Sequence, residues 1–221
     1  MIITIDGPAG SGKSTAARNI AKALGIAYLD TGATYRAVAL KALREGADMQ
    51  DEAALAKLAR KADIRLEPAP EGLRVFLDGE DVSREIRSAK VTDNTRYVAR
   101  SPAVREVLVA LQRRIGAALG DFATEGRDQG SVVFPEADVK FYLVASPEAR
   151  ARRRFEEMRA SGEDVEYEQV LEGILARDGG DRGRAVAPLV RPAGAVEIDT
   201  THNTIEQTTA ELLRRLKERG G

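Results

Sequence analysis

The sequence of 221 residues contains no cysteine and a single histidine, His202. Without cysteine the chain has no disulfide, no thiolate metal site and no cysteine nucleophile. One histidine cannot build a histidine-based metal cluster. Any chemistry must therefore use lysine, arginine, aspartate or serine side chains and the polypeptide backbone.

Long apolar runs and an excess of one charge are also absent. The apolar stretches fall far short of the roughly 20 residues of a membrane-spanning helix. The first residues, MIITIDG, lack the basic region and cleavage site of a secretory signal. The 34 basic and 35 acidic residues balance, so no global charge favours a nucleic acid or an anionic membrane. We therefore expect a cytoplasmic protein with no nucleic-acid and no membrane partner.

The first part of the chain alternates strand and helix patterns. A short apolar run, 2–6, leads to a glycine-rich turn and then to apolar residues at helical spacing up to Gly25. A strand through 27–29 and a helix ending at Gly46 repeat this order, and a third helix follows Asp51. Such an alternation predicts a parallel sheet flanked by helices, and hence the α/β class.

Residues 63–87 differ in texture, because apolar and polar residues alternate around turns that contain proline and glycine. This pattern predicts a small antiparallel sheet inserted into the α/β body. Further helices are predicted after two Ser-Pro pairs and near the C-terminus, and further strands at FATEG, VKFYLVA and AVEID. The predicted division is a core of three segments, 1–35, 89–150 and 185–221, with an insert, 36–88, and a helical lid, 151–184.

A phosphate-binding loop is the clearest functional signal. Residues 7–14 read GPAGSGKS, which matches the full GxxxxGK[ST] pattern between a predicted strand and a predicted helix. Glycines let backbone N–H groups turn toward phosphate, Lys13 reaches the β and γ phosphates, and Ser14 can ligate Mg²⁺. The predicted nucleotide-binding residues are Gly7, Pro8, Ala9, Gly10, Ser11, Gly12, Lys13, Ser14 and Thr15.

The loop alone leaves several classes open: a small-molecule kinase, a GTPase, a motor ATPase and a nucleotide-sensing switch. The chain length, the inserted segment and the arginine-rich late segment favour a small kinase, which has to close over two substrates and exclude water. A GTPase is expected to carry an NKxD-type motif that reads guanine, and the sequence has none.

Four sequence blocks resemble bacterial cytidylate kinases. They are ITIDGPAGSGKST at 3–15, LDTGATYRAVAL at 29–40, EGRDQGSVVFPEADVKFYL at 125–143 and RDGGDRGRAVAPL at 177–189. The segments LDGEDVSREIRS and SPAVREVLVALQRR are also similar to that family. The resemblance implies a nucleoside-monophosphate (NMP) kinase fold with an inserted NMP-binding domain and a helical lid. It also implies in-line transfer of the γ-phosphoryl group from ATP to CMP or dCMP, with Mg²⁺.

The resemblance implies that Thr31 and Arg36 bind the acceptor phosphate, which suits the planar fork of an arginine. By themselves these two residues also fit a helix-capping turn with an exposed arginine. Arg105 and Asp128 are implied to read the base, since an ionised aspartate accepts from the cytosine N4 amine while arginine donates to N3 and O2. Without the family, they also fit a surface arginine and a turn ion pair.

The resemblance implies that Arg127, Arg177 and Arg184 act with Lys13 as catalytic residues on the transferred phosphate, and that Asp181 binds the acceptor ribose. Arginines that arrive with a closing lid would neutralise the phosphate oxygens and displace water. In isolation, the pattern RDxxDxxR also fits a solvated charge run on a loop.

The chain departs from the family at one predicted substrate-binding position. Arg96 stands where the family usually has a small hydroxyl residue near the base. Either Thr95 supplies that contact, or Arg96 adds a donor toward cytosine O2.

Two other functions remain open. A kinase for UMP, AMP or a hydroxyl metabolite such as shikimate or gluconate would carry the same loop. An alcohol acceptor would favour a carboxylate base, for which Glu125 and Asp30 are candidates. A nucleotide-sensing regulator would show a large exposed apolar patch or an added interaction domain. We expect a monomer whose partners are ATP, CMP and dCMP.

Overall fold

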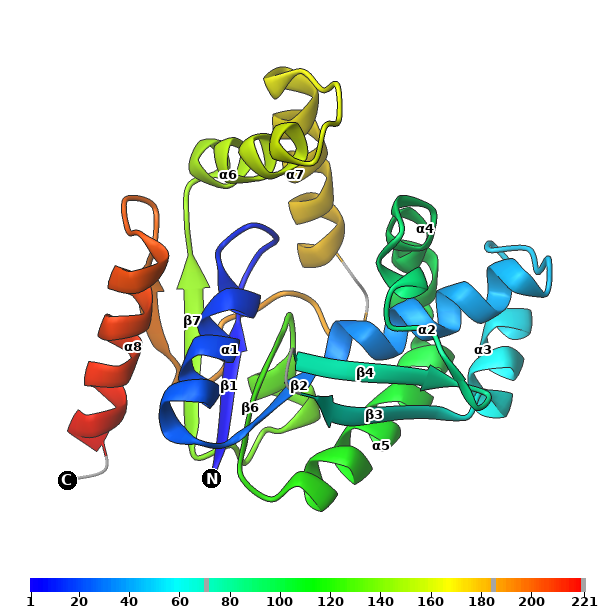
Figure 1. Cartoon of the computed structure of the whole chain (residues 1–221), viewed down its shortest axis with the longest axis horizontal. Coiled ribbons are helices and arrows are strands. Elements are labelled where there is room, and N and C mark those ends of the chain that lie inside the picture. Colours follow the sequence, from blue (N-terminus) through cyan, green and yellow to red (C-terminus); the bar gives the residue numbers. More distant parts are fainter. Residues whose placement is uncertain (70–71, 184–185, 220–221) are drawn as a thin grey trace. The chain divides into compact units, whose positions relative to one another are not determined.

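The computed structural model of the chain describes residues 1–69, 72–183 and 186–219 (Figure 1). The chain forms two compact units, one made of Met1–Ile26 with Ala123–Gly221 and the other of Ala27–Phe122. The predicted division into a core, an insert and a lid is based on the proposed roles of these segments. It stays a prediction. In the described part of the chain, none of the helices combines the length and the apolarity needed to cross a bilayer.

The main sheet has five strands and is parallel, which confirms the α/β prediction. Its strands are β1 (Ile2–Asp6), β2 (Ala27–Asp30), β6 (Phe122–Gly126), β7 (Val139–Val144) and β8 (Val196–Asp199). Within the first unit the strands follow the order β6-β1-β7-β8. The apolar runs that predict β1 and β7 are buried at their centres, where Ile3, Ile5, Phe141 and Leu143 have no exposed surface. Because parallel strands end at one edge of a sheet, the loops that follow them gather there.

Four helices of the first unit follow the predicted pattern. They are α1 (Lys13–Leu24), α6 (Pro147–Ala160), α7 (Tyr167–Arg182) and α8 (Ile205–Arg219). The hydroxyl of Ser146 caps α6 by accepting a hydrogen bond from the Ala149 N–H, and Pro147 takes the first helical position, as expected for a Ser-Pro pair. Helix α1 packs against α8, and α6 packs against α7 (Figure 1). A short π-helical turn, η2 (Gln129–Val133), was not predicted.

The second unit contains the predicted small antiparallel sheet, with the order β3-β4-β5. Its strands are β3 (Ile64–Ala69), β4 (Gly72–Leu77) and β5 (Glu80–Asp81). Its helices are α2 (Thr31–Arg44), α3 (Glu52–Lys61), α4 (Ala89–Arg100) and α5 (Pro102–Leu119), with a short 3-10 turn, η1 (Glu85–Arg87). Val75 and Leu77 of the sheet lie in one apolar core with residues of α2, α3, α4 and α5. The small sheet therefore belongs to the hydrophobic core of its unit.

Helix α4 is an α-helix that the sequence patterns did not predict. Only Val91 and Val98 are buried on it, so the apolar stripe is too thin to give a clear helical period. Helix α2 begins at Thr31, before its apolar stripe, because the Asp30 side chain accepts a hydrogen bond from the Ala33 N–H at 3.0 Å and caps the helix.

Candidate functional site

The phosphate-binding loop lies between the end of β1 and the start of α1, as predicted. Gly7 has φ 149°, and a Cβ there would lie 2.2 Å from the carbonyl oxygen of Leu143 in β7. Gly12 has φ 87° at the N-cap of α1. Only glycine fits both positions, the first through close approach to the backbone of β7 and the second through its left-handed conformation. The GxxxxGKS pattern therefore forms the strand-loop-helix unit that phosphate binding requires.

Lys13 is buried, and its Nζ donates to the carbonyl oxygen of Pro8 at 2.6 Å. Burial, together with the positive charges of Arg127 and Arg177, lowers the pKa of Lys13 to about 7, against the opposing effects of Glu125 and Asp6. Three cationic side chains thus share one region of the first unit. A bound polyanion would stabilise their charges, which is the electrostatic property expected of a polyphosphate site.

Ser14 and Glu125 together suit a magnesium ion. The Ser14 hydroxyl donates to Glu125 Oε1 at 2.8 Å, and hydroxyl and carboxylate oxygens are ligands that Mg²⁺ accepts. Nowhere in the described ranges do three or more histidine or acidic side chains gather as a metal cage.

Asp6, the last residue of β1, was not among the predicted site residues. It has no exposed surface, and its two oxygens accept hydrogen bonds from the N–H groups of Gln129 at 2.8 Å and Gly130 at 2.7 Å. A Cβ on Gly130 would lie 2.7 Å from Thr4 Oγ1 and 3.3 Å from Asp6 Oδ2, so a glycine is needed for this approach. Asp6 therefore fixes the π-helical turn that directly follows Arg127 and Asp128.

Arg127 and Asp181 are brought together. Arg127 Nε donates to Asp181 Oδ2 at 2.7 Å, and the Asp181 side chain is only 4% exposed. This pair links the end of β6 to α7. Arg177 lies one turn earlier on α7, and Arg184 falls outside the described residues.

A second ion pair, Arg150 with Asp178, was not predicted. Arg150 NH1 and NH2 donate to the two oxygens of Asp178 at 2.9 and 2.6 Å, and both side chains are buried. From the sequence, Arg150 cannot be told from its neighbours in the run RARRR, because all of these arginines share one helix and one chemistry.

The remaining predicted residues lie in the second unit, where Asp30 organises the start of α2. Arg36 NH2 donates to Asp30 Oδ2 at 2.8 Å, and Arg87 NH2 lies 3.4 Å from the same oxygen. A Cβ on Gly32 would lie 3.0 Å from Arg36 NH1, so Gly32 leaves space for the guanidinium to fold back over the first turn. Thr31, the first residue of that turn, is buried.

Arg105 and Arg96 differ in their surroundings. Arg105 is 4% exposed and lies over the Tyr35 ring at 5.6 Å, with NH1 donating to the Ala99 carbonyl at 3.3 Å. Arg96 is exposed and lies over the Tyr97 ring at 4.9 Å. Because Arg105 is buried, it is not an exposed arginine on the helix surface.

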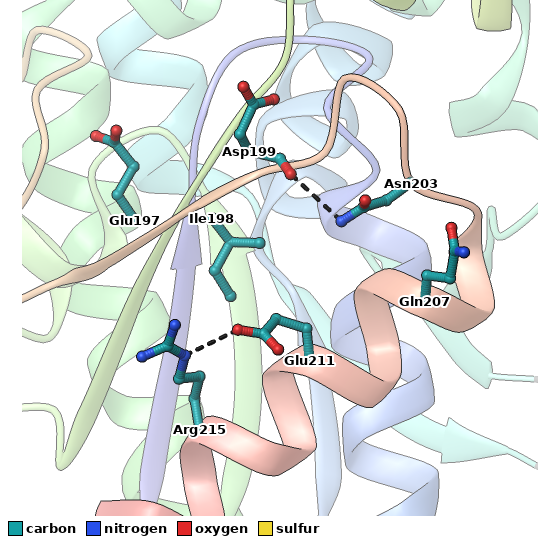
Figure 2. A pocket seen from close by; sticks show the side chains of 7 residues that line it. All are labelled: Glu197, Ile198, Asp199, Asn203, Gln207, Glu211 and Arg215. Carbon is teal, nitrogen blue, oxygen red and sulfur yellow. Dashed lines mark hydrogen bonds and ion pairs between the residues drawn. The ribbon is translucent and has the colours of Figure 1, made fainter.

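A separate hollow lies between β8 and α8 and contains none of the predicted site residues (Figure 2). Its lining residues are Glu197, Ile198, Asp199, Asn203, Gln207, Glu211 and Arg215. Its one cation, Arg215, donates to Glu211 at 2.8 Å, and Glu197 and Asp199 are two further acidic residues of its lining. An acidic hollow of this kind repels phosphate, so it is not a nucleotide-binding site.

Comparison with known proteins points to one family. The profile of the family described as "Cytidylate kinase" matches residues 3–218. The chain belongs to the cytidylate kinase family. A protein of Caldanaerobacter subterraneus subsp. tengcongensis named cytidylate kinase is 49% identical over 216 residues, which cover 98% of this chain and 94% of that protein. One of Pelotomaculum thermopropionicum with the same name is 51% identical over 215 residues, covering 97% and 95%.

Two solved structures share the fold of this family member at low identity. A protein of Eubacterium ventriosum described as uncharacterized has a TM-score of 0.51 at 11% identity and covers 99% of this chain and 98% of its own. Shikimate kinase from Bacteroides thetaiotaomicron has a TM-score of 0.50 at 13% identity and covers 98% of each chain. Both likenesses concern the architecture and not the substrate.

The buried carboxyl of Asp6 predicts a pH-dependent stability. Burial and the charge of Asp128 raise the pKa of Asp6 to about 7, against its two N–H donors and Lys13. The folded state therefore holds this proton at pH values where the unfolded chain has released it. The stabilisation is complete below about pH 4 and is lost as the pH rises to about 7. We expect Asp6→Asn to lose this dependence, so that it gains stability relative to the wild type over this window, on the order of 1–4 kcal/mol.

Urea unfolding of both proteins at a series of pH values measures this difference. Asp81→Asn is the control, because hydrogen bonds from Ser83 and Arg74 lower the pKa of Asp81 to about 2 and its ionisation contributes little change above about pH 4. Parallel stability curves for the wild type and Asp6→Asn would contradict the assignment.

Proposed function

We propose that this chain transfers the γ-phosphoryl group of ATP to CMP or dCMP and releases ADP with CDP or dCDP. The observation that carries the proposal is the complete phosphate-binding loop around buried Lys13, in a chain that matches the cytidylate kinase family over residues 3–218. The relatives named cytidylate kinase support the same reaction.

The donor side of the reaction uses the first unit. The N–H groups of the loop and the N-terminus of α1 hold the ATP phosphates, and Lys13 contacts the β and γ phosphates. Arg127 and Arg177 add positive charge at the place where the transferring phosphoryl group carries negative charge. Their influence on the pKa of Lys13 supports this placement, because both positive charges act on the Lys13 ammonium. Arg184 is proposed for the same role from the family pattern alone.

Ser14 would hold Mg²⁺, and Glu125, at 2.8 Å from the Ser14 hydroxyl, would orient it or its waters. When bound, the ion neutralises the phosphate oxygens that face each other during transfer.

The acceptor side uses residues proposed one by one from the family pattern. Arg36 and Thr31 bind the acceptor phosphate, and Asp30 supports the proposal by holding the Arg36 guanidinium at 2.8 Å. Asp181 binds the ribose hydroxyls. The acceptor oxygen is already anionic near neutral pH, so alignment and charge cancellation replace a general base.

Asp128 and Arg105 read the cytosine base, and Arg96 or Thr95 completes the readout. Uracil would present its O4 acceptor to the Asp128 carboxylate, leaving two acceptors face to face. Such an unmade contact costs about 1–3 kcal/mol. The buried position of both Asp128 and Arg105 supports a readout of this strength.

An alcohol acceptor is less well supported, because it would favour a carboxylate base. Asp30 already accepts from the Ala33 N–H and from Arg36, and Glu125 accepts from Ser14. Both candidate bases thus have other roles. A cytoplasmic location and a monomeric state stay predictions of the sequence.

Release of ADP from Mg-ATP, measured against CMP, dCMP, UMP, AMP, GMP, shikimate and no acceptor, tests the proposed function. We expect turnover with CMP and dCMP far above that with every other compound. Turnover with another acceptor would keep the phosphoryl-transfer chemistry and overturn the base readout. Release without any acceptor would point to an ATPase or a sensor.

Replacement of Lys13 should separate transfer from acceptor binding. Lys13→Ala removes the cation that contacts the β and γ phosphates, so we expect kcat to fall by at least about 100-fold. CMP affinity, measured by calorimetry, should change little. Lys140→Ala is the control, because Lys140 donates a hydrogen bond to the Pro135 carbonyl and lies outside the loop. Unchanged turnover in Lys13→Ala would remove Lys13 from the mechanism.

Replacement of Asp128 should weaken base discrimination. Asp128→Asn has a side chain of the same shape that can rotate to offer either an acceptor or a donor. We expect the ratio of kcat/KM for CMP over UMP to narrow by about 10-fold to 100-fold, which corresponds to about 1–3 kcal/mol. Steady-state kinetics with both nucleotides measure the ratio. An unchanged ratio would refute the assigned role.

A further inference from the structure

Helix α6 approaches the phosphate-binding loop closely at Gly10. A Cβ on Gly10 would lie 3.0 Å from Arg150 Cβ and 3.3 Å from the Arg150 carbonyl oxygen, and Gly10 has φ 75°. From this position the Arg150 side chain extends along the loop to Ala9. It is 2% exposed, and NH1 donates to the carbonyl oxygen of Ala9 at 3.1 Å. Figure 1 shows the loop between β1 and α1 facing α6.

This contact constrains the direction of a peptide group. In a trans peptide the C=O and the following N–H point in opposite directions, and no peptide bond among the described residues is cis. A guanidinium that holds the Ala9 carbonyl toward α6 therefore turns the Gly10 N–H toward the opposite side of the loop. Loops of this type bind phosphate through such N–H groups.

Asp178 of α7 completes the arrangement. It receives two hydrogen bonds from Arg150, at 2.9 and 2.6 Å, while Arg150 Nε donates to the Ala145 carbonyl at 2.9 Å. Every nitrogen of the buried guanidinium thus has an acceptor, which fixes its plane. Asp178 also lies between Arg177 and Asp181 on α7. The ion pair of Arg150 with Asp178 therefore fixes α7 relative to the loop.

We propose that Arg150 and Asp178 are positioning residues for the ATP phosphates. Arg150 orients the Ala9–Gly10 peptide, and Asp178 holds Arg150 in place and thereby ties α7, with Arg177, to the loop. Neither side chain needs to touch the nucleotide. The consequence of this positioning for catalysis rests on the proposed function. The test needs only the binding of a nucleotide.

A purely structural ion pair would have the same geometry, so the test has to separate stability from binding. The double variant Arg150→Met/Asp178→Leu replaces both charges by apolar side chains, which often preserves stability because no buried charge is left alone. We expect its Tm within about 5 °C of the wild type. Its affinity for a non-hydrolysable Mg-ATP analogue, measured by calorimetry without acceptor, should fall by about tenfold or more.

Arg150→Lys provides a second variant. It keeps the opposite charges, and hence the fold, but one ammonium group cannot serve the Ala9 carbonyl and both Asp178 oxygens in the same plane. It should also bind the analogue more weakly and raise KM for ATP, while KM for CMP stays within about twofold. Glu157→Gln is the matched control, because it breaks the exposed pair with Arg154 at 3.4 Å on the same helix and should leave both measurements unchanged.

Wild-type affinity for the analogue in either folded variant would overturn the positioning role and leave a structural pair. Since analogue binding needs no acceptor, a wild-type protein that fails to phosphorylate CMP would count against the proposed function, while the binding comparison would still decide the role of Arg150 and Asp178.

Discussion

A loop that turns its N–H groups toward a ligand must find hydrogen-bond donors for its carbonyl oxygens on the other side. In this protein each carbonyl from residue 8 to residue 11 has such a donor. The pairs are Pro8 with Ser11 and Lys13, Ala9 with Arg150, Gly10 with Arg153, and Ser11 with Thr200. The donors come from the loop itself, from α6 and from the segment after β8. The form of the phosphate-binding loop is therefore a property of the whole first unit.

The same requirement explains the buried charges of that unit. Arginines on α6 that supply donors to the loop need counter-charges where they are buried, and Asp178 meets this need for Arg150. Asp181 does the same for Arg127. Leaving such a charge unpaired in the interior is costly, so the loop, the arginines and the acidic residues of α7 form one connected set. The proposed catalytic role of Arg177 and the ion pair of Asp178 consequently fall on neighbouring residues of one helix.

The second unit follows a simpler logic. Asp30 caps α2 and at the same time holds Arg36, so a local helix-start signal also presents a guanidinium. The apolar core that α2 shares with the small sheet gives this helix start a rigid support. In its proposed role, Arg36 would meet the acceptor phosphate from this support with little loss of side-chain freedom.

The sequence by itself determined the features that depend on neighbouring residues. Strand and helix periods, the caps at Ser146 and Asp51, and the glycines of the loop are local signals, and the structure confirms them. Tertiary structure alone decided which arginine of RARRR is buried, because Arg150 meets Ala9 and Asp178 at separations of 141 and 28 residues. It also decided the partner of Asp6, 123 residues away. Side chains of identical chemistry are distinguished only by what the fold places beside them.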